Sequence, residues 1–167
     1  YDFLEKVEMG TNLTKRQLAH HEKTKRRDLA MMTLLLGTGI RVSECVGLNI
    51  DDVDINSASI RIIRKGGNAD VVYFGYEVED KLLDYIDERE EIIPVEGHEK
   101  ALFLSSQRKR ISVRAVEKMV EKYAKITNTL KHITPHKLRS TYGTQLYRET
   151  GDIYLVADVL GHKDVNT

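Results

Sequence analysis

The chain has 167 residues, of which 41% are hydrophobic and 31% are charged, and its formal net charge is zero. This length suits one domain or two small ones, and the sequence holds neither an apolar run of about 18 residues, as a membrane span needs, nor the pattern of a signal peptide. The single cysteine, Cys45, excludes an intrachain disulfide framework and fits a reducing cytosol. We therefore expect a cytoplasmic protein without a membrane partner. Because the chain starts at Tyr1 and not at Met, we expect it to be a piece of a larger protein.

Charge is distributed unevenly along the chain. Residues 77–99 hold ten acids against two bases, a net charge of −8. Residues 100–148 hold twelve bases against two acids, a net charge of +10, so the two stretches differ by eighteen charges. This asymmetry predicts a basic working face and an acidic far side. Two ordinary solvated helix faces are the alternative.

The first helices are predicted from apolar spacing and caps. Apolar residues between 3 and 7 predict a short amphipathic helix that ends at Gly10. Thr14 and Gln17 have the spacing of a capping box, and the polar run from 20 to 27 is a solvated connection or a helix surface. Residues 29–36 are apolar nearly all round, which predicts a buried helix that ends at the glycines of positions 37 and 39.

Arg41 follows these glycines and emerges between two predicted helices. Ser43 is the predicted N-cap of the second helix. Glu44 stands three residues after Arg41 and can steady it. A purely structural Arg41–Glu44 salt bridge is the alternative.

A hairpin is predicted next. Residues 51–54 contain three aspartates but lack the Gly and the distal Glu of a calcium loop, so we interpret them as a polar turn. Residues 59–64 and 71–74 are strand-like, and the segment Lys65–Asn68 (KGGN) between them predicts a β-hairpin with a Gly/Asn turn. The turn can place the ammonium of Lys65 over a ligand; a solvated turn lysine is the alternative.

The acidic stretch contains the spacing of another helix around Val78 and Leu82, broken by Pro94. Residues 101–104 predict a short strand, and a basic loop follows at 107–110. Ser112 is the predicted cap of a further helix. Its inner face comprises Val113, Val116, Met119, Val120 and Tyr123, and its outer face comprises Lys118, Lys122 and Lys125.

The segment Thr134–Thr141 (TPHKLRST) predicts an anion site. Thr134 can cap a helix, and Pro135 fits its first turn. His136 and Arg139 are then three apart on one face, beside a helix N-terminus, where a phosphate is well held. A last helix over 153–160 ends at a glycine that is followed at once by His162.

Four motifs in this order resemble the tyrosine recombinase family, which includes the phage integrases and the Xer-like recombinases. They are Thr38–Glu44 (TGIRVSE), the hairpin lysine Lys65, His136–Arg139 (HKLR) and Leu160–His162 (LGH). The resemblance implies a mainly α-helical catalytic domain with a small antiparallel β-sheet (α+β). It also implies that 1–12 is a helix or linker from a missing core-binding domain and that 13–167 is the catalytic domain, incomplete at its C-terminus.

The resemblance implies site-specific DNA recombination, in which a tyrosine hydroxyl attacks a phosphodiester and forms a 3′-phosphotyrosyl link. Arg41 and Arg139 would clamp the non-bridging oxygens in place of a metal, so no cofactor is expected. Lys65 would protonate the leaving 5′-oxygen, His136 would act in proton transfer with the nucleophile, and His162 would bind the phosphate. In supporting roles, Glu44 would orient Arg41, and the predicted DNA contacts are Arg108, Lys109, Arg110 and Lys137. The expected partners are double-stranded DNA and, in the full-length protein, the other copies of a recombining tetramer.

The nucleophile is missing from this pattern. In the family it lies two to three helical turns beyond the LGH motif, past Thr167, so we expect this chain to be inactive alone. A non-catalytic DNA-binding module is the alternative. A metal hydrolase using His132, His136 and His162 is a further alternative, but no carboxylate or HExxH pattern accompanies these residues.

Overall fold

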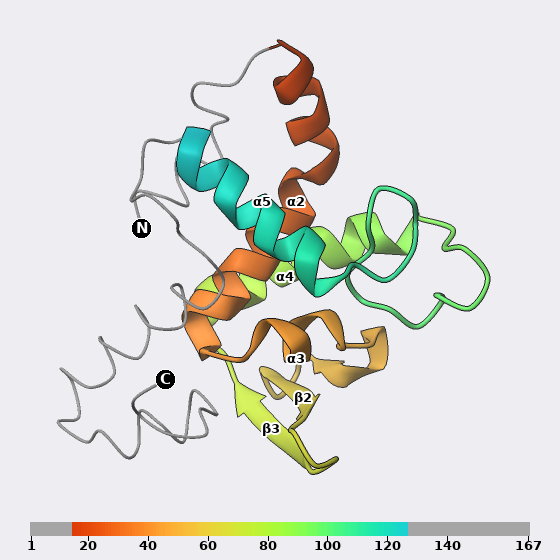
Figure 1. The fold of residues 1–167 in the computed structure, drawn as a ribbon. Helices are drawn as coiled ribbons and strands as arrows, with labels where there is room; N and C mark the ends of the chain where they lie inside the picture. The colour runs from red at the N-terminus through yellow and green to blue at the C-terminus, as the bar shows by residue number, and fades with distance from the viewer. Residues whose placement is uncertain (1–14, 127–167) are drawn as a thin grey trace, which may run out of the picture.

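The computed structural model describes residues 15–126, with side chains described from 23 to 122. It consists of helices around a small antiparallel sheet (Figure 1), which confirms the predicted fold class. The helix predicted near the N-terminus and all motifs beyond residue 126 lie outside the described residues. So does Thr14, the predicted cap, and the assignment of domain boundaries remains a prediction. No described helix is both long and apolar enough to cross a membrane.

Helix α2 (Lys15–Thr38) is the central element of the core. The stretch predicted to be a buried helix is its C-terminal part, where residues 29–36 are buried on every side. The polar run from 20 to 27 belongs to the same helix, so of the two interpretations the helix surface is correct. Thr24 in this run and Asp28 directly after it are nevertheless buried.

Helix α4 (Tyr76–Glu90) packs against α2. At the contact, a Cβ added to Gly37 would lie only 2.6 Å from Cγ2 of Val78, so a glycine permits this close approach. The predicted inner positions Val78 and Leu82 are buried. The neighbouring Leu83 is 41% exposed.

The sheet has the strand order β1-β2-β3, with β1 at Val53–Asp54, β2 at Ser59–Ile63 and β3 at Ala69–Tyr73. Strands β2 and β3 pair antiparallel with Ile62 opposite Asp70, which confirms the hairpin. The N–H of Arg64 donates to the carbonyl of Asn68 at 2.7 Å, closing the turn. Both glycines of the turn have positive φ, 95° and 86°, a conformation that other residues rarely adopt. Figure 1 shows the hairpin projecting away from the helices.

Two local predictions are wrong. Residues 51–54 are not a simple turn, because a short 3₁₀ helix, η1 (Ile50–Asp52), leads directly into strand β1. Residues 101–104 are buried but form no regular strand: only the isolated bridges Asn49–Ala101 and Leu104–Arg110 pair there. The segment is instead held by side chains of α4, since the hydroxyl of Tyr85 donates to the carbonyl of Leu102 at 2.8 Å. Apolar character predicted the burial correctly, but it could not specify a pairing partner.

Helix α5 (Val113–Ile126) begins as predicted, since Oγ of Ser112 accepts the N–H of Ala115 at 3.1 Å. Its inner residues Val116, Met119 and Val120 are buried, as the spacing predicts. Its lysines are not all on the outside. Lys118 is exposed, but Lys122 is half-buried, and this burial lowers its pKa, opposed by the nearby charge of Asp28.

Candidate active site

Arg41 lies in the short connection between α2 and α3 (Val42–Val46). The end of α2 is fixed by the hydroxyl of Thr38, which donates to the carbonyl of Leu34 at 2.6 Å. Gly39 then turns the chain with a φ of 70°, and the side chain of Ile40 is fully buried. The residue before Arg41 is therefore anchored in the core, which gives the arginine a fixed starting point.

Glu44 fixes the other side of Arg41. Its Oε1 accepts the main-chain N–H of Arg41 at 2.7 Å, so the N-cap position of α3 is Arg41 and the capping acceptor comes from Glu44. The prediction of Ser43 as N-cap is wrong, because the N-cap is Arg41 and the helix begins at Val42, two residues earlier than predicted. The side chain of Glu44 thus holds the main chain of Arg41, and Glu44 is itself buried.

The ion-pair partner of Glu44 is Arg64. Nη1 of Arg64 lies 3.2 Å from Oε2 of Glu44, and their side chains are 20% and 5% exposed. Within the described part of the chain, no group accepts a hydrogen bond from the guanidinium of Arg41 and no carboxylate forms an ion pair with it. The described residues therefore do not support the alternative of a structural Arg41–Glu44 salt bridge.

Lys65 follows Arg64 in the turn between β2 and β3, and it is exposed. Two of the predicted catalytic residues, Arg41 and Lys65, thus belong to the described structure. The Glu44–Arg64 pair links the loop that carries the first to the turn that carries the second. The other predicted catalytic residues, His136, Arg139 and His162, lie outside the described residues.

The cations of the basic loop at 107–110 differ in their hydrogen-bond partners. Nη1 of Arg110 donates to the carbonyls of Val46 and Leu48, both at 2.9 Å, and Nη2 binds Oδ1 of Asn49. Arg110 is therefore a structural link to the end of α3. Nη1 of Arg108 donates to the carbonyl of Ile93 at 3.2 Å.

The side chain of Lys109 is exposed, and no hydrogen bond or ion pair joins it to another described residue, although its main-chain carbonyl accepts the N–H of Ser105 at 2.7 Å. Lys109 is therefore the cation of this loop whose side chain is most available to an external anion. Lys137, the fourth predicted DNA contact, lies outside the described residues.

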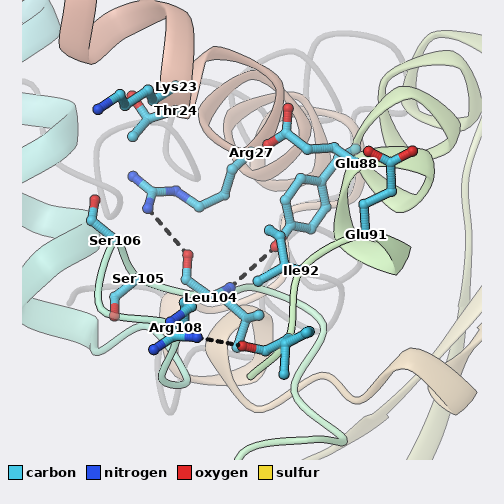
Figure 2. A pocket seen from close by; sticks show the side chains of 12 residues that line it. Lys23, Thr24, Arg27, Glu88, Glu91, Ile92, Leu104, Ser105, Ser106 and Arg108 are labelled. Carbon is cyan, nitrogen blue, oxygen red and sulfur yellow. Dashed lines mark hydrogen bonds between the residues drawn. The ribbon is translucent and has the colours of Figure 1, made fainter. Parts of the chain in front are cut away.

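A pocket of about 450 Å³ lies between α2, the end of α4 and the segment after Leu104. Figure 2 shows the side chain of Arg27 directed toward Leu104, whose carbonyl accepts a hydrogen bond from its Nη1 at 3.1 Å, with Glu88 and Glu91 on the α4 side. Neither Arg41 nor Lys65 lines it. Because its charged groups include both signs and Arg27 and Arg108 already bind main-chain carbonyls, we do not place the active site in this pocket.

No group of three or more His, Cys, Asp or Glu side chains gathers as a metal would require within the described residues. Cys45 is fully buried, and this burial raises the pKa of its thiol to about 12. The thiol is therefore neither a thiolate nucleophile nor a ready metal ligand near neutral pH.

The helical core and the small three-stranded antiparallel sheet define a mainly helical domain of the α+β class. The model of the Phage integrase family matches residues 11–167, and the chain belongs to this family, with the fold of a tyrosine recombinase catalytic domain. It is 42% identical over 166 residues to the tyrosine recombinase XerS of Streptococcus agalactiae serotype III (strain NEM316). That match covers 96% of this chain but 46% of the relative, so the chain spans about half the length of the curated relatives it matches.

Solved structures agree with this assignment. The crystal structure of XerA recombinase matches 99% of this chain and 56% of its own, with a TM-score of 0.79 and 28% identity. The XerH site-specific recombinase bound to its difH substrate, in a pre-cleavage complex, matches 99% of this chain and 46% of its own, with a TM-score of 0.77 and 25% identity.

Sequence reasoning missed Arg64. The pattern of the hairpin placed Arg64 at the end of a strand, where a charged residue is usually solvated. Nothing in the sequence connected it with Glu44, which lies 20 positions earlier. The available signal was Glu44, an acid close to a predicted helix start. If such a carboxylate is buried, one main-chain N–H does not satisfy it, and a cation elsewhere in the chain is needed.

Proposed function

We propose that this chain carries the phosphate-activating part of a site-specific tyrosine recombinase that cleaves and rejoins double-stranded DNA in the cytoplasm. The observation that carries the proposal is Arg41: its main chain is fixed by buried Ile40 and by Glu44, and its guanidinium has no partner among the described residues. An arginine so placed is preorganised for an anion, since its fork is planar and always charged.

The proposed reaction is transfer of a DNA phosphoryl group to a tyrosine. The tyrosine oxygen attacks phosphorus and forms a 3′-phosphotyrosyl bond, while the bond from phosphorus to the 5′-oxygen breaks. Arg41 and Arg139 stabilise the charge on the non-bridging oxygens. Lys65 gives its proton to the departing 5′-oxygen. His136 acts in proton transfer with the nucleophile, and His162 hydrogen-bonds the phosphate.

Rejoining reverses these steps on another strand. The 5′-hydroxyl of the second strand attacks the phosphotyrosyl bond and regenerates the free tyrosine, so no external energy source is consumed. This exchange requires several copies on paired sites, and we propose a tetramer of the full-length protein. Lys109 and Lys137 are the proposed DNA contacts, whereas Arg108 and Arg110 already donate hydrogen bonds to main-chain carbonyls and are proposed to stabilise the loop.

Covalent trapping tests the proposal. The full-length protein that contains this chain is incubated with a nicked duplex carrying its recombination site, which is found by sequencing the genomic DNA that the protein binds. The short strand released by cleavage diffuses away, so the adduct accumulates and is seen on a denaturing gel. We expect a protein–DNA band for the full-length protein and none for residues 1–167 alone, because no tyrosine follows His162 in this sequence.

Two results would overturn the proposal. Sequence-selective binding by the full-length protein without any covalent band would favour a non-catalytic DNA-binding module. A band from residues 1–167 alone would show that the nucleophile is one of the tyrosines before His162.

A further inference from the structure

Arg64 connects the two proposed catalytic residues that the structure describes. Its guanidinium approaches Glu44 with Nη1 at 3.4 Å from Oε1 and 3.2 Å from Oε2. The same Oε1 accepts the N–H of Arg41 at 2.7 Å. One buried carboxylate is thus shared between the main chain of Arg41 and the side chain of Arg64.

The main chain of Arg64 also closes the turn that carries Lys65. Its N–H donates to the carbonyl of Asn68 at 2.7 Å, and its carbonyl accepts the N–H of Gly67 at 3.0 Å. Lys65 is the next residue, so its main chain is anchored on one side by these bonds. The two turn glycines have positive φ and leave space around them, so they hold the turn weakly by themselves.

The contact with Glu44 is the stronger of the two that Arg64 makes. Glu44 is buried, with only 5% of its side chain exposed, and a buried carboxylate without its cation would be costly. Asp70, the second partner, lies 3.4 Å from Nε of Arg64, and its side chain is 54% exposed. An exposed pair of this kind contributes little, so the position of Arg64 is set by Glu44.

We infer that Arg64 is a positioning residue, which aligns Lys65 with the phosphate held by Arg41 by tying the β2–β3 turn to Glu44. This inference rests on the proposed function, since it needs Lys65 to be the proton donor. Loss of the tie leaves the Glu44–Arg41 bond in place and frees only the turn. The defect therefore falls on proton donation to the 5′-oxygen and spares the clamp on the non-bridging oxygens.

The experiment measures single-turnover cleavage by the full-length protein on two substrates. One is an ordinary duplex; the other has sulfur in place of the bridging 5′-oxygen at the scissile phosphate. The thiolate leaves without needing a proton, so it bypasses the general acid. Arg64→Ala is compared with Arg61→Ala, which removes an exposed arginine of strand β2, three residues before Arg64, that has no ion pair with Glu44.

We expect Arg64→Ala to cleave ordinary DNA about 10²-fold more slowly, the scale of a misplaced catalytic group, and to regain most of this rate on the sulfur substrate. In a Lys65→Ala background, Arg64→Ala should cause little further loss, because both changes disable the same step. Arg61→Ala should show neither pattern. Arg64→Lys keeps the positive charge but loses the forked guanidinium, so we expect a smaller loss of cleavage rate with the same recovery on the sulfur substrate. This variant replaces Arg64→Ala in the experiment if the alanine variant is unstable.

Equal losses on both substrates, or losses that multiply in the double variant, would overturn the inference, since Arg64 would then act on DNA binding or on Arg41. An unchanged rate on ordinary DNA would overturn it as well. Failure of the proposed function is distinguishable, because the unmodified protein would then form no covalent adduct with either substrate.

Discussion

Oε1 of Glu44 lies 2.7 Å from the main-chain nitrogen of Arg41, so a buried carboxylate caps the helix that starts beside the proposed phosphate clamp. The bond fixes where the arginine leaves the backbone without occupying its guanidinium. Glu44 thereby serves stability and the geometry of the site through the same contact.

Replacing Glu44 by alanine removes the cap and leaves the partly buried Arg64 without its strongest partner. We expect Glu44→Ala to lower the free energy of unfolding by about 1–3 kcal/mol, measured by urea denaturation. Glu90→Ala, at an exposed position of α4, is the matched control and should change it by less than about 0.5 kcal/mol. Equal effects of the two variants would contradict the assigned role of Glu44.

Alanine variants of two neighbouring cations in the basic loop should affect different properties, one the stability of the fold and the other DNA binding. Arg110→Ala removes hydrogen bonds to Val46, Leu48 and Asn49, so we expect a loss of about 2 kcal/mol in the free energy of unfolding. Lys109→Ala should leave stability within about 0.5 kcal/mol. It should weaken DNA binding and reduce the slope of log affinity against log salt by about 0.9, the value for one phosphate contact.

Urea denaturation and a salt series of binding isotherms give these quantities. If Lys109→Ala binds DNA with unchanged affinity and salt slope, the loop does not contact phosphate. If Arg110→Ala is as stable as the unmodified protein, its hydrogen bonds are dispensable.

Much of this fold could be predicted from the sequence, because helices and the hairpin follow from local patterns. The buried part of α2, the Ser112 cap and the Lys65–Asn68 turn depend on residues close in the chain. The contacts that sequence reasoning missed join distant residues: Glu44 with Arg64, and Arg110 with the end of α3. A single sequence contains the charges of such pairs but not the spatial neighbourhood that pairs them.

The thiol of Cys45 should be inert in the folded protein. Burial raises its pKa from 9.0 to about 12, so the folded state keeps a proton that the unfolded state releases between these values. The contribution of this group to stability is thus complete below about pH 9 and is lost as the pH rises toward 12. Iodoacetamide at pH 8 should modify Cys45 only after denaturation, as followed by mass spectrometry. Rapid alkylation of the native protein would show that the thiol is accessible.

Charge alone should not suffice at position 41. Arg41→Lys keeps the cation but loses the planar fork that binds two oxygens. In the full-length protein we expect cleavage to fall by about 10²–10³-fold, the effect of losing one oxyanion donor, with the fold intact by circular dichroism. Cleavage at the unmodified rate would remove Arg41 from the proposed site.

The central claim is that Lys65 and Arg41 act on different oxygens of one phosphate, and single-turnover cleavage of two substrates tests it most directly. In the full-length protein, Lys65→Ala should cleave ordinary DNA poorly and recover most of its rate when sulfur replaces the bridging 5′-oxygen, since a thiolate leaves without a proton. Arg41→Ala should be slow on both substrates, because its partners are the non-bridging oxygens. Rescue of neither variant, or of both to the same extent, would contradict this division of roles.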